Sequence, residues 1–405
     1  MWNGQIKQVH WEPTDRCNSA CPMCPRFTKD GFEVETLENQ EWTLESFKSS
    51  WPVEFIRGLD KILSCGNFGD PCACREFVDI YEYIREINPS IGLACNTNGS
   101  LRNPSWWKRL GSVMREDQHP GNYCTFSLDG LEDTNHLYRR NTVWSKIMEN
   151  AQAFIDGGGV AHWDYIVFEH NEHQVDEAKE LARKMGFKNF NIKKTTRWNR
   201  YEDGQGKYTV VWKGKELYDL KQPKQEKYQH NFEDTILFKQ SKYQDVSLEQ
   251  FKTIVGNQNF DFRFVNGKYE KIHLNNLSIA CRAVKDARDH QPNNEIFISA
   301  GGTVHPCCFL GSEPFRDRTL RIDVNYNKMV ELNGGLDSLN MHKRNLYDII
   351  QSPIFQQWIP DTWKASGNKT MMPAKCGSCC GVEFNALDYG ELGNKKDSYI
   401  EENDK

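Results

Sequence analysis

Three cysteines with regular spacing lie near the start of the chain. Cys17, Cys21 and Cys24 form a C-x3-C-x2-C loop directly after a predicted strand. Three thiolates on one short loop can bind three irons of a [4Fe–4S] cube, whose usual ligands are four cysteines. The fourth iron then keeps an open coordination position. A zinc site or three incidental thiols is the alternative, but zinc usually binds paired cysteine or histidine motifs, and no such pair lies nearby.

The residues around this loop resemble the radical S-adenosylmethionine (SAM) superfamily. Its members share the cysteine spacing and carry an aromatic or large apolar residue before the third cysteine, where this chain has Met23. In that family SAM chelates the open iron, and one electron from the cluster cleaves it to methionine and a 5′-deoxyadenosyl radical. The radical then abstracts hydrogen from the substrate. The resemblance implies that Cys17, Cys21 and Cys24 form the catalytic centre, while the protein orients the cofactors and excludes water.

The resemblance covers residues 6–200 and implies further contacts to SAM. The segment 63–71 looks like the family's Gly-Gly-Glu-Pro motif, with Asp70 where glutamate is usual. Arg139 matches an arginine that pairs with the SAM carboxylate, a task suited to a guanidinium. The implied SAM-binding residues are Met23, Gly66, Asn67, Phe68, Gly69, Asp70, Asn96, Asn98, Ser127, Asp129 and Arg139.

A second group of cysteines lies near the other end of the chain. Gly302 to Cys307 reads G-x4-C, and Cys376 and Cys379 form a C-x2-C pair. With Cys281 upstream, this pattern looks like the Twitch or SPASM extension of radical SAM enzymes, which binds auxiliary clusters. The resemblance implies one auxiliary [4Fe–4S] cluster held by Cys281, Cys307, Cys376 and Cys379. The adjacent Cys308 and Cys380 are alternative ligands, and zinc is the alternative metal.

The elements that would position these residues alternate between strand and helix. Hydrophobic runs predict strands at 6–11, 62–64, 91–95, 124–128, 165–168 and 190–195, with amphipathic helices between them. Six consecutive β/α units predict an α/β fold, a partial (β/α)6 TIM-like barrel with its site at the carboxyl ends of the strands. A smaller C-terminal α+β domain would hold the auxiliary cluster.

The chain divides into four predicted regions. Residues 1–200 form the barrel, and residues 201–275 form a polar connecting segment with a helix at 248–255. Residues 276–385 form the auxiliary-cluster domain, and 386–405 form a polar tail.

Composition narrows the function class. The formal net charge of −5 and pI of about 6.2 lack the basic excess of nucleic-acid binders. No segment approaches the ~20 apolar residues of a membrane helix, and no signal peptide is evident. Clustered cysteines in a chain without export signals favour metal binding in the reducing cytoplasm.

The expected reaction is oxidation or C–H functionalisation. Few residues precede the first strand, which leaves no room for an N-terminal peptide-recognition domain. We therefore expect a small-molecule or short-peptide substrate, with flavodoxin or ferredoxin as electron donor. The alternatives are a non-catalytic protein that binds iron–sulfur clusters and SAM, and a nucleic-acid-modifying radical enzyme. Polar residues at strand ends are candidates to face the substrate, namely Glu12, Arg26, Glu169, His170, Arg197 and Trp198.

Overall fold

Parallel strands alternate with helices in the first half of the molecule. The computed structural model describes residues 6–195, 197, 207–229, 260–265, 268–273, 281, 283, 294–315, 323–363, 372–373 and 375–376. The six parallel strands are β1 (Gln8–Trp11), β2 (Lys61–Ser64), β3 (Gly92–Thr97), β4 (Tyr123–Ser127), β5 (Ala161–Ile166) and β6 (Asn189–Lys193). They pair in chain order, and β1, β3 and β5 are mostly buried, whereas β6 is mostly half-buried. The predicted α/β fold is confirmed.

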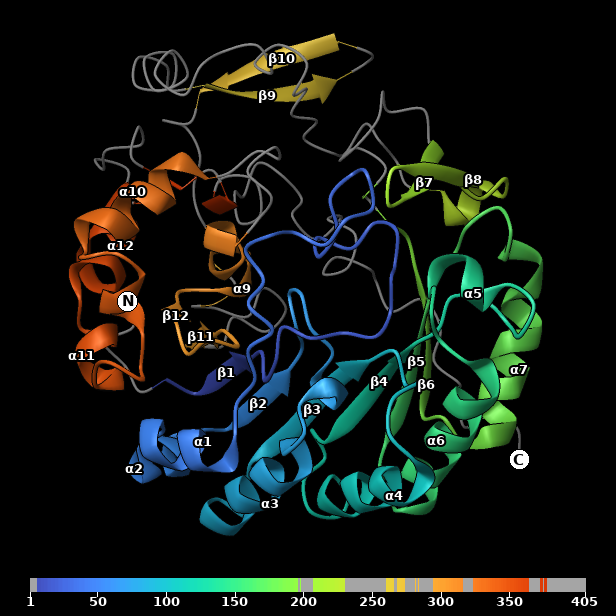
Figure 1. Ribbon diagram of the computed structural model, residues 1–405, viewed down its shortest axis with the longest axis horizontal. Coiled ribbons are helices and arrows are strands. Elements are labelled where there is room, and N and C mark those ends of the chain that lie inside the picture. The colour runs from blue at the N-terminus through green and yellow to red at the C-terminus, as the bar shows by residue number, and fades with distance from the viewer. Residues whose placement is uncertain are drawn as a thin grey trace.

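Helices cover the outer face of this curved sheet (Figure 1). They are α1 (Leu44–Ser50), α2 (Val53–Gly58), α3 (Phe77–Ile87), α4 (Pro104–Val113), α5 (Asn135–Tyr138), α6 (Trp144–Asp156) and α7 (Val175–Met185). Local sequence sets several of their ends. Thr43 and Ser46 form a capping box at the start of α1. Gly186 ends α7 at φ 91°, a left-handed conformation that favours glycine.

The C-terminal region joins the same sheet. Strand β11 (Glu295–Ile298) pairs in parallel with β1, and β12 (Val304–His305) returns antiparallel to β11. The sheet order is therefore β12-β11-β1-β2-β3-β4-β5-β6. The helices that follow are α9 (Cys308–Gly311), α10 (Val324–Leu332), α11 (Leu346–Ile350) and α12 (Ile359–Trp363), the last continuing a π-helical turn at Ile354–Trp358. Strands β11 and β12 form a hairpin, and its pairing with β1 was not anticipated. The domain boundaries remain a prediction.

Two further hairpins lie in the predicted connecting segment. Strands β7 (Lys207–Trp212) and β8 (Lys215–Lys221) form one, and β9 (Phe260–Val265) and β10 (Lys268–His273) form the other. The predicted helix at 248–255 and the predicted tail lie outside the described residues. Within the described part of the chain, no helix is both long and apolar enough to cross a bilayer.

Aromatic packing fixes the strand that leads into the cysteine loop. Trp11 is fully buried at the end of β1, and its ring lies 5.3 Å from Phe47 and 6.0 Å from Trp51. Trp42 closes the far end of the loop and donates a 3.0 Å hydrogen bond from Nε1 to the Ser299 carbonyl. Each aromatic pair adds about 0.5–1.5 kcal/mol beyond its buried area. Both ends of the loop at 12–42 are thus anchored in the core.

Candidate iron–sulfur and SAM site

The three N-terminal cysteines lie on the loop that follows β1, with hydrogen-bond donors directed at two of the sulfurs. Cys21 is buried, whereas Cys17 and Cys24 are partly exposed. Asn98 Nδ2 lies 3.8 Å from Cys17 Sγ, and Arg139 Nη1 lies 3.7 Å from Cys21 Sγ. Donors of this kind stabilise the charge of a ligating thiolate and are one of the protein's means of setting a cluster's potential.

The chemistry of this donor set fits a cubane cluster. Burial raises the pKa of the Cys17 thiol well above its usual range, and Asp70 and the two other cysteines raise it further. Burial also raises the pKa of Cys24. A metal centre would therefore displace protons as it binds. Among the described residues, no three His, Cys, Asp or Glu side chains converge as they would around a single metal ion. Iron–sulfur clusters take cysteine thiolates as ligands, and this loop carries three cysteines.

Arg139 is held beside Cys21 by an acidic partner. Its Nε donates to Asp129 Oδ2 at 2.6 Å, and the backbone N–H of Ile166 donates to Asp129 Oδ1 at 2.6 Å. Asp129 is fully buried, and burial raises its pKa although the guanidinium opposes that shift. The ion pair links the end of β4 to the cysteine loop. The remaining N–H groups of Arg139 give it further donor capacity.

Asp70 lies in a dense web of local hydrogen bonds. Thr97 Oγ1 donates to both of its carboxylate oxygens, at 2.9 and 3.0 Å. The N–H of Asn98 donates to Oδ2 at 2.8 Å, and the N–H of Cys72 donates to Oδ1 at 2.9 Å. Asp70 thus joins the loop after β2 to the end of β3. In particular, it fixes the backbone of Asn98, whose side chain contacts Cys17.

The loop at 66–70 packs tightly against the cysteine loop. A Cβ atom on Gly69 would lie 1.8 Å from the Thr14 carbonyl oxygen, and one on Gly66 would lie 2.1 Å from the Gly69 carbonyl oxygen. Glycine is therefore required by close backbone approach at both positions. Glu12 Oε1 accepts from the N–H groups of Phe68 and Gly69, at 2.7 and 3.0 Å. The glutamate at the end of β1 thereby anchors this loop.

The remaining predicted SAM residues lie at neighbouring strand ends. Asn96 Nδ2 lies 3.4 Å from Cys65 Sγ on the adjacent strand end. Ser127 is half-buried at the last position of β4. Met23 is fully buried, and Asn67 donates to the carbonyl of Cys308 at 2.9 Å. All the predicted SAM residues except Arg139, which follows α5, therefore lie at the ends of β1 to β4 or on the loops directly after them.

Part of the second cysteine group is also brought together. Cys307 and Cys376 both lie close enough to Tyr326 to raise the pKa of its hydroxyl, although burial is the larger cause. Tyr326 in turn lies 2.6 Å from His305 Nδ1. Cys281 and Cys308 are partly exposed. Cys379 and Cys380 lie outside the described residues, so the predicted four-cysteine set is described only in part.

Most of the residues expected to face a substrate have protein partners instead. Arg26 is 3% exposed and pairs with Glu33 at 3.0 Å. Glu169 pairs with Lys224 at 2.6 Å. The His170 ring stacks on Phe168 with centroids 5.3 Å apart. Glu12 anchors the loop at 66–70, Arg197 Nη1 donates to the Met23 carbonyl at 3.3 Å, and Trp198 lies outside the described residues.

Hairpin β7–β8 covers the cysteine loop, a role that sequence reasoning missed. Tyr208 donates a hydrogen bond from its hydroxyl to the Pro22 carbonyl at 2.9 Å. Tyr208, Val210 and Leu220 pack with Cys21 and Met23 in one buried cluster. The available signal was the alternation of polar Lys207 and Thr209 with apolar Tyr208 and Val210.

Comparison with protein families identifies the C-terminal region. Residues 290–380 match the SPASM model, an iron–sulfur cluster-binding domain. The match confirms the predicted resemblance of this region to a SPASM extension. The matched region contains Cys307 and Cys376 as well as β11, so it includes the strand that pairs with β1.

Solved structures with a similar course of the chain have low sequence identity. Streptococcus suis SuiB bound to precursor peptide SuiA is 14% identical, with a TM-score of 0.46; the match covers 87% of this chain and 66% of SuiB. Hexahistidine-tagged anSMEcpe with bound AdoMet is 15% identical, with a TM-score of 0.47, and coverage is 97% and 88%. This chain thus spans just under two thirds of that SuiB chain. No protein of curated function matches the sequence.

Proposed function

We propose that this protein is a radical SAM enzyme whose catalytic cluster is held by Cys17, Cys21 and Cys24. The observation that carries the proposal is the set of three thiols on one anchored loop, with Asn98 and Arg139 directed at two of the sulfurs. When bound, a cluster of this kind supplies the electron that cleaves SAM to methionine and a 5′-deoxyadenosyl radical, which abstracts hydrogen from the substrate. The other residues of the site position the cofactors and shield them from water.

The surrounding residues have distinct positioning roles in this proposal. Asp70 fixes the backbone of Asn98 instead of meeting the SAM ammonium group directly, because each of its carboxylate oxygens already has two hydrogen-bond contacts, from Thr97 and from the N–H of Cys72 or Asn98. Backbone carbonyls of the loop at 66–69 are left for the ammonium group. Arg139 is shared between Asp129 and the SAM carboxylate. Asn96 and Ser127 offer polar groups for the rest of SAM.

Water exclusion falls to the hairpin and the buried residues of the loop. Met23 is fully buried, and Val210 of β7 packs in the same buried cluster. A dry site strengthens the electrostatic interactions within it and protects reactive species from side reactions.

The C-terminal cysteines are proposed to hold one auxiliary [4Fe–4S] cluster. The SPASM match supports iron–sulfur binding there, and Cys281, Cys307, Cys376 and Cys379 are the proposed ligands. We further propose oxidation or C–H functionalisation of a small molecule or short peptide in the cytoplasm. The clustered cysteines support a reducing compartment.

Electron paramagnetic resonance tests whether SAM binds at an open iron. Reconstituted protein reduced with dithionite should give the signal of a reduced cluster, and added SAM should shift that signal. A Cys376→Ala variant should keep the shift, because that cysteine lies outside the barrel site. If SAM binds but leaves the spectrum unchanged, the open-iron assignment is wrong, and the non-catalytic binding protein becomes the better description.

A further inference from the structure

A cavity of about 450 Å³ opens beside Cys17 and is lined by arginines. Arg16, Arg75 and Arg102 lie on its wall together with Cys17 and Cys72, and none of the described residues that line it is acidic. The chain as a whole has a net charge of −5. Three guanidinium groups around one opening are therefore a local departure from the charge of the molecule.

The arginines are held in place by the protein. Arg16 Nη1 and Arg75 Nε both donate to Glu41 Oε1, at 2.8 and 2.7 Å. Glu41 is only 6% exposed, whereas the side chains of Arg16 and Arg75 are 41% and 72% exposed. Arg102 donates from Nε to the Cys72 carbonyl and from Nη2 to the Cys74 carbonyl, both at 2.7 Å.

Two carboxylates lie close to these arginines, but neither lines the cavity. Glu41 pairs with both Arg16 and Arg75, and Glu76 Oε2 accepts from the N–H of Leu44 at 2.7 Å. The positive groups are thus the ones presented at the opening. A rim of this kind attracts an acidic partner over a distance and raises its association rate.

The cavity also gives access to one side of the cysteine loop. Cys21 and Met23 pack under hairpin β7–β8, and Cys24 packs against the same buried cluster. Cys17 and Cys24 are both partly exposed, but of the three cysteines it is Cys17 that forms part of the cavity wall. A protein that docks on the arginines would therefore place its redox centre close to a ligand of the proposed cluster.

We propose that the cavity lined by Arg16, Arg75 and Arg102 is the docking site of an acidic one-electron donor protein. The inference rests on the proposed function. One electron leaves the donor's flavin or iron–sulfur centre, which is oxidised, and reduces the cluster beside Cys17; no covalent bond forms or breaks. An acidic protein is favoured over a small anion because Arg75 projects outward, where it can meet a surface rather than a bound ion.

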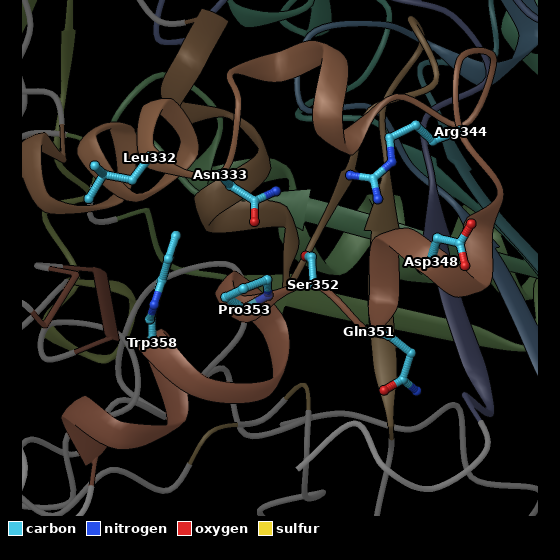
Figure 2. A pocket seen from close by; sticks show the side chains of 8 residues that line it. All are labelled: Leu332, Asn333, Arg344, Asp348, Gln351, Ser352, Pro353 and Trp358. Atoms are coloured by element: carbon cyan, nitrogen blue, oxygen red, sulfur yellow. The ribbon is translucent and has the colours of Figure 1, made fainter.

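A second cavity supplies the matched control. It has a volume of about 480 Å³ and lies among the C-terminal helices, where Arg344 points into it (Figure 2). Arg344 is exposed like Arg75, and its Nη1 donates to the Ser338 carbonyl at 3.0 Å. Reversing its charge changes the net charge of the protein by the same amount, at a site remote in sequence from the cysteine loop.

The test is the rate at which reduced flavodoxin reduces the reconstituted protein, followed by absorbance in a stopped-flow instrument. Arg75→Glu should lower the second-order rate about tenfold at low salt, with the difference lost at high salt because ions screen the attraction. Arg75→Lys and Arg344→Glu should stay within about twofold of wild type, since the first keeps the charge and the second lies elsewhere. Reduction by dithionite should be equal in all four proteins.

The possible failures are distinguishable. If Arg75→Glu reacts as fast as wild type, or if Arg344→Glu slows the reaction equally, the docking site is wrong. A wild type that dithionite reduces but flavodoxin does not would also overturn the docking proposal, while the proposed function would stand. If the wild type holds no reducible cluster, the proposed function itself fails.

Discussion

Asn67 donates a hydrogen bond from Nδ2 to the backbone carbonyl of Cys308 at 2.9 Å, although the two residues are 241 positions apart. Asn67 belongs to the loop implicated in SAM binding, and Cys308 begins α9 directly after the proposed auxiliary ligand Cys307. The contact therefore joins the two proposed cofactor regions. It acts together with the pairing of β1 and β11, which holds the same regions in one sheet.

Removing this link should loosen α9 without unfolding the barrel. Asn67→Ala should lower the local stability of residues 307–311 by about 1 kcal/mol, the usual net value of one hydrogen bond. Hydrogen–deuterium exchange measures this directly, as faster exchange in that segment. Asn189→Ala, which removes a contact to His162 within the barrel, is the control. Equal protection of α9 in both variants would show that the contact is not stabilising.

Asp70 should be sensitive even to an isosteric change. In Asp70→Asn, the amide keeps one acceptor oxygen and places an N–H₂ group against either the Asn98 or the Cys72 N–H. We expect a loss of about 1–3 kcal/mol in the free energy of unfolding, measured by denaturant titration. Asp60→Asn is the control, because Asp60 is 66% exposed and pairs with Lys7 at 3.5 Å. That change should cost under about 0.5 kcal/mol. Similar losses in both variants would contradict the hydrogen-bond account.

Glu12 should make stability depend on pH. Burial raises its pKa from 4.5 to about 7, although the N–H groups of Phe68 and Gly69 oppose the shift. The folded state therefore holds this proton more tightly than the unfolded state does. Its contribution is fully present below pH 4.5 and is lost as pH rises to about 7.

The matching variant is Glu12→Gln, which keeps an acceptor for both N–H groups but does not ionise. Relative to this variant, the wild type should lose on the order of 3 kcal/mol of unfolding free energy between about pH 4.5 and 7.5. Denaturant titrations across this range measure the difference. Glu54→Gln, at a 74% exposed position, should show the same pH dependence of the unfolding free energy as the wild type. A constant difference between wild type and Glu12→Gln across the range would show that Glu12 has an ordinary pKa.

Iron content tests the two cysteine groups separately. Anaerobically reconstituted wild type should hold about eight irons and eight sulfides, as two cubane clusters require. A variant with Cys17, Cys21 and Cys24 all replaced by alanine should retain about four of each. Chemical analysis of iron, sulfide and zinc gives the result. If the triple variant keeps all of its iron, the assignment of a cluster to Cys17, Cys21 and Cys24 is wrong. If the C-terminal cysteines bind zinc instead of iron, the assignment of the auxiliary cluster is wrong.

The first half of the fold was predictable because its signals are local. Short stretches of sequence are enough to indicate apolar strands, amphipathic helices and the helix end at Gly186. The structure confirms the six parallel strands and the helices between them, but among the described residues the element after β6 is strand β7. The fifth strand runs over Ala161–Ile166 rather than the predicted 165–168. The apolar Val167 and Phe168 continue beyond its end, whereas its first residues include the polar His162 and Asp164.

Non-local contacts were beyond such reasoning. The pairing of Gln8 with Glu295 depends on backbone hydrogen bonds between distant segments, which no periodicity encodes. The Asp129–Arg139 ion pair likewise requires the geometry of the strand end. Each residue was singled out from the sequence as a SAM contact, but the sequence did not show that the two would bind each other.

Formation of 5′-deoxyadenosine tests the central claim most directly. Wild type incubated anaerobically with SAM and dithionite should produce it slowly even without substrate. Cys17→Ala, Cys21→Ala and Cys24→Ala should each abolish it, because the cluster would lose a ligand. Cys124→Ala, a buried thiol of β4, should retain it. If fully reconstituted wild type binds SAM and is reduced, yet yields no 5′-deoxyadenosine, the protein is not a radical SAM enzyme.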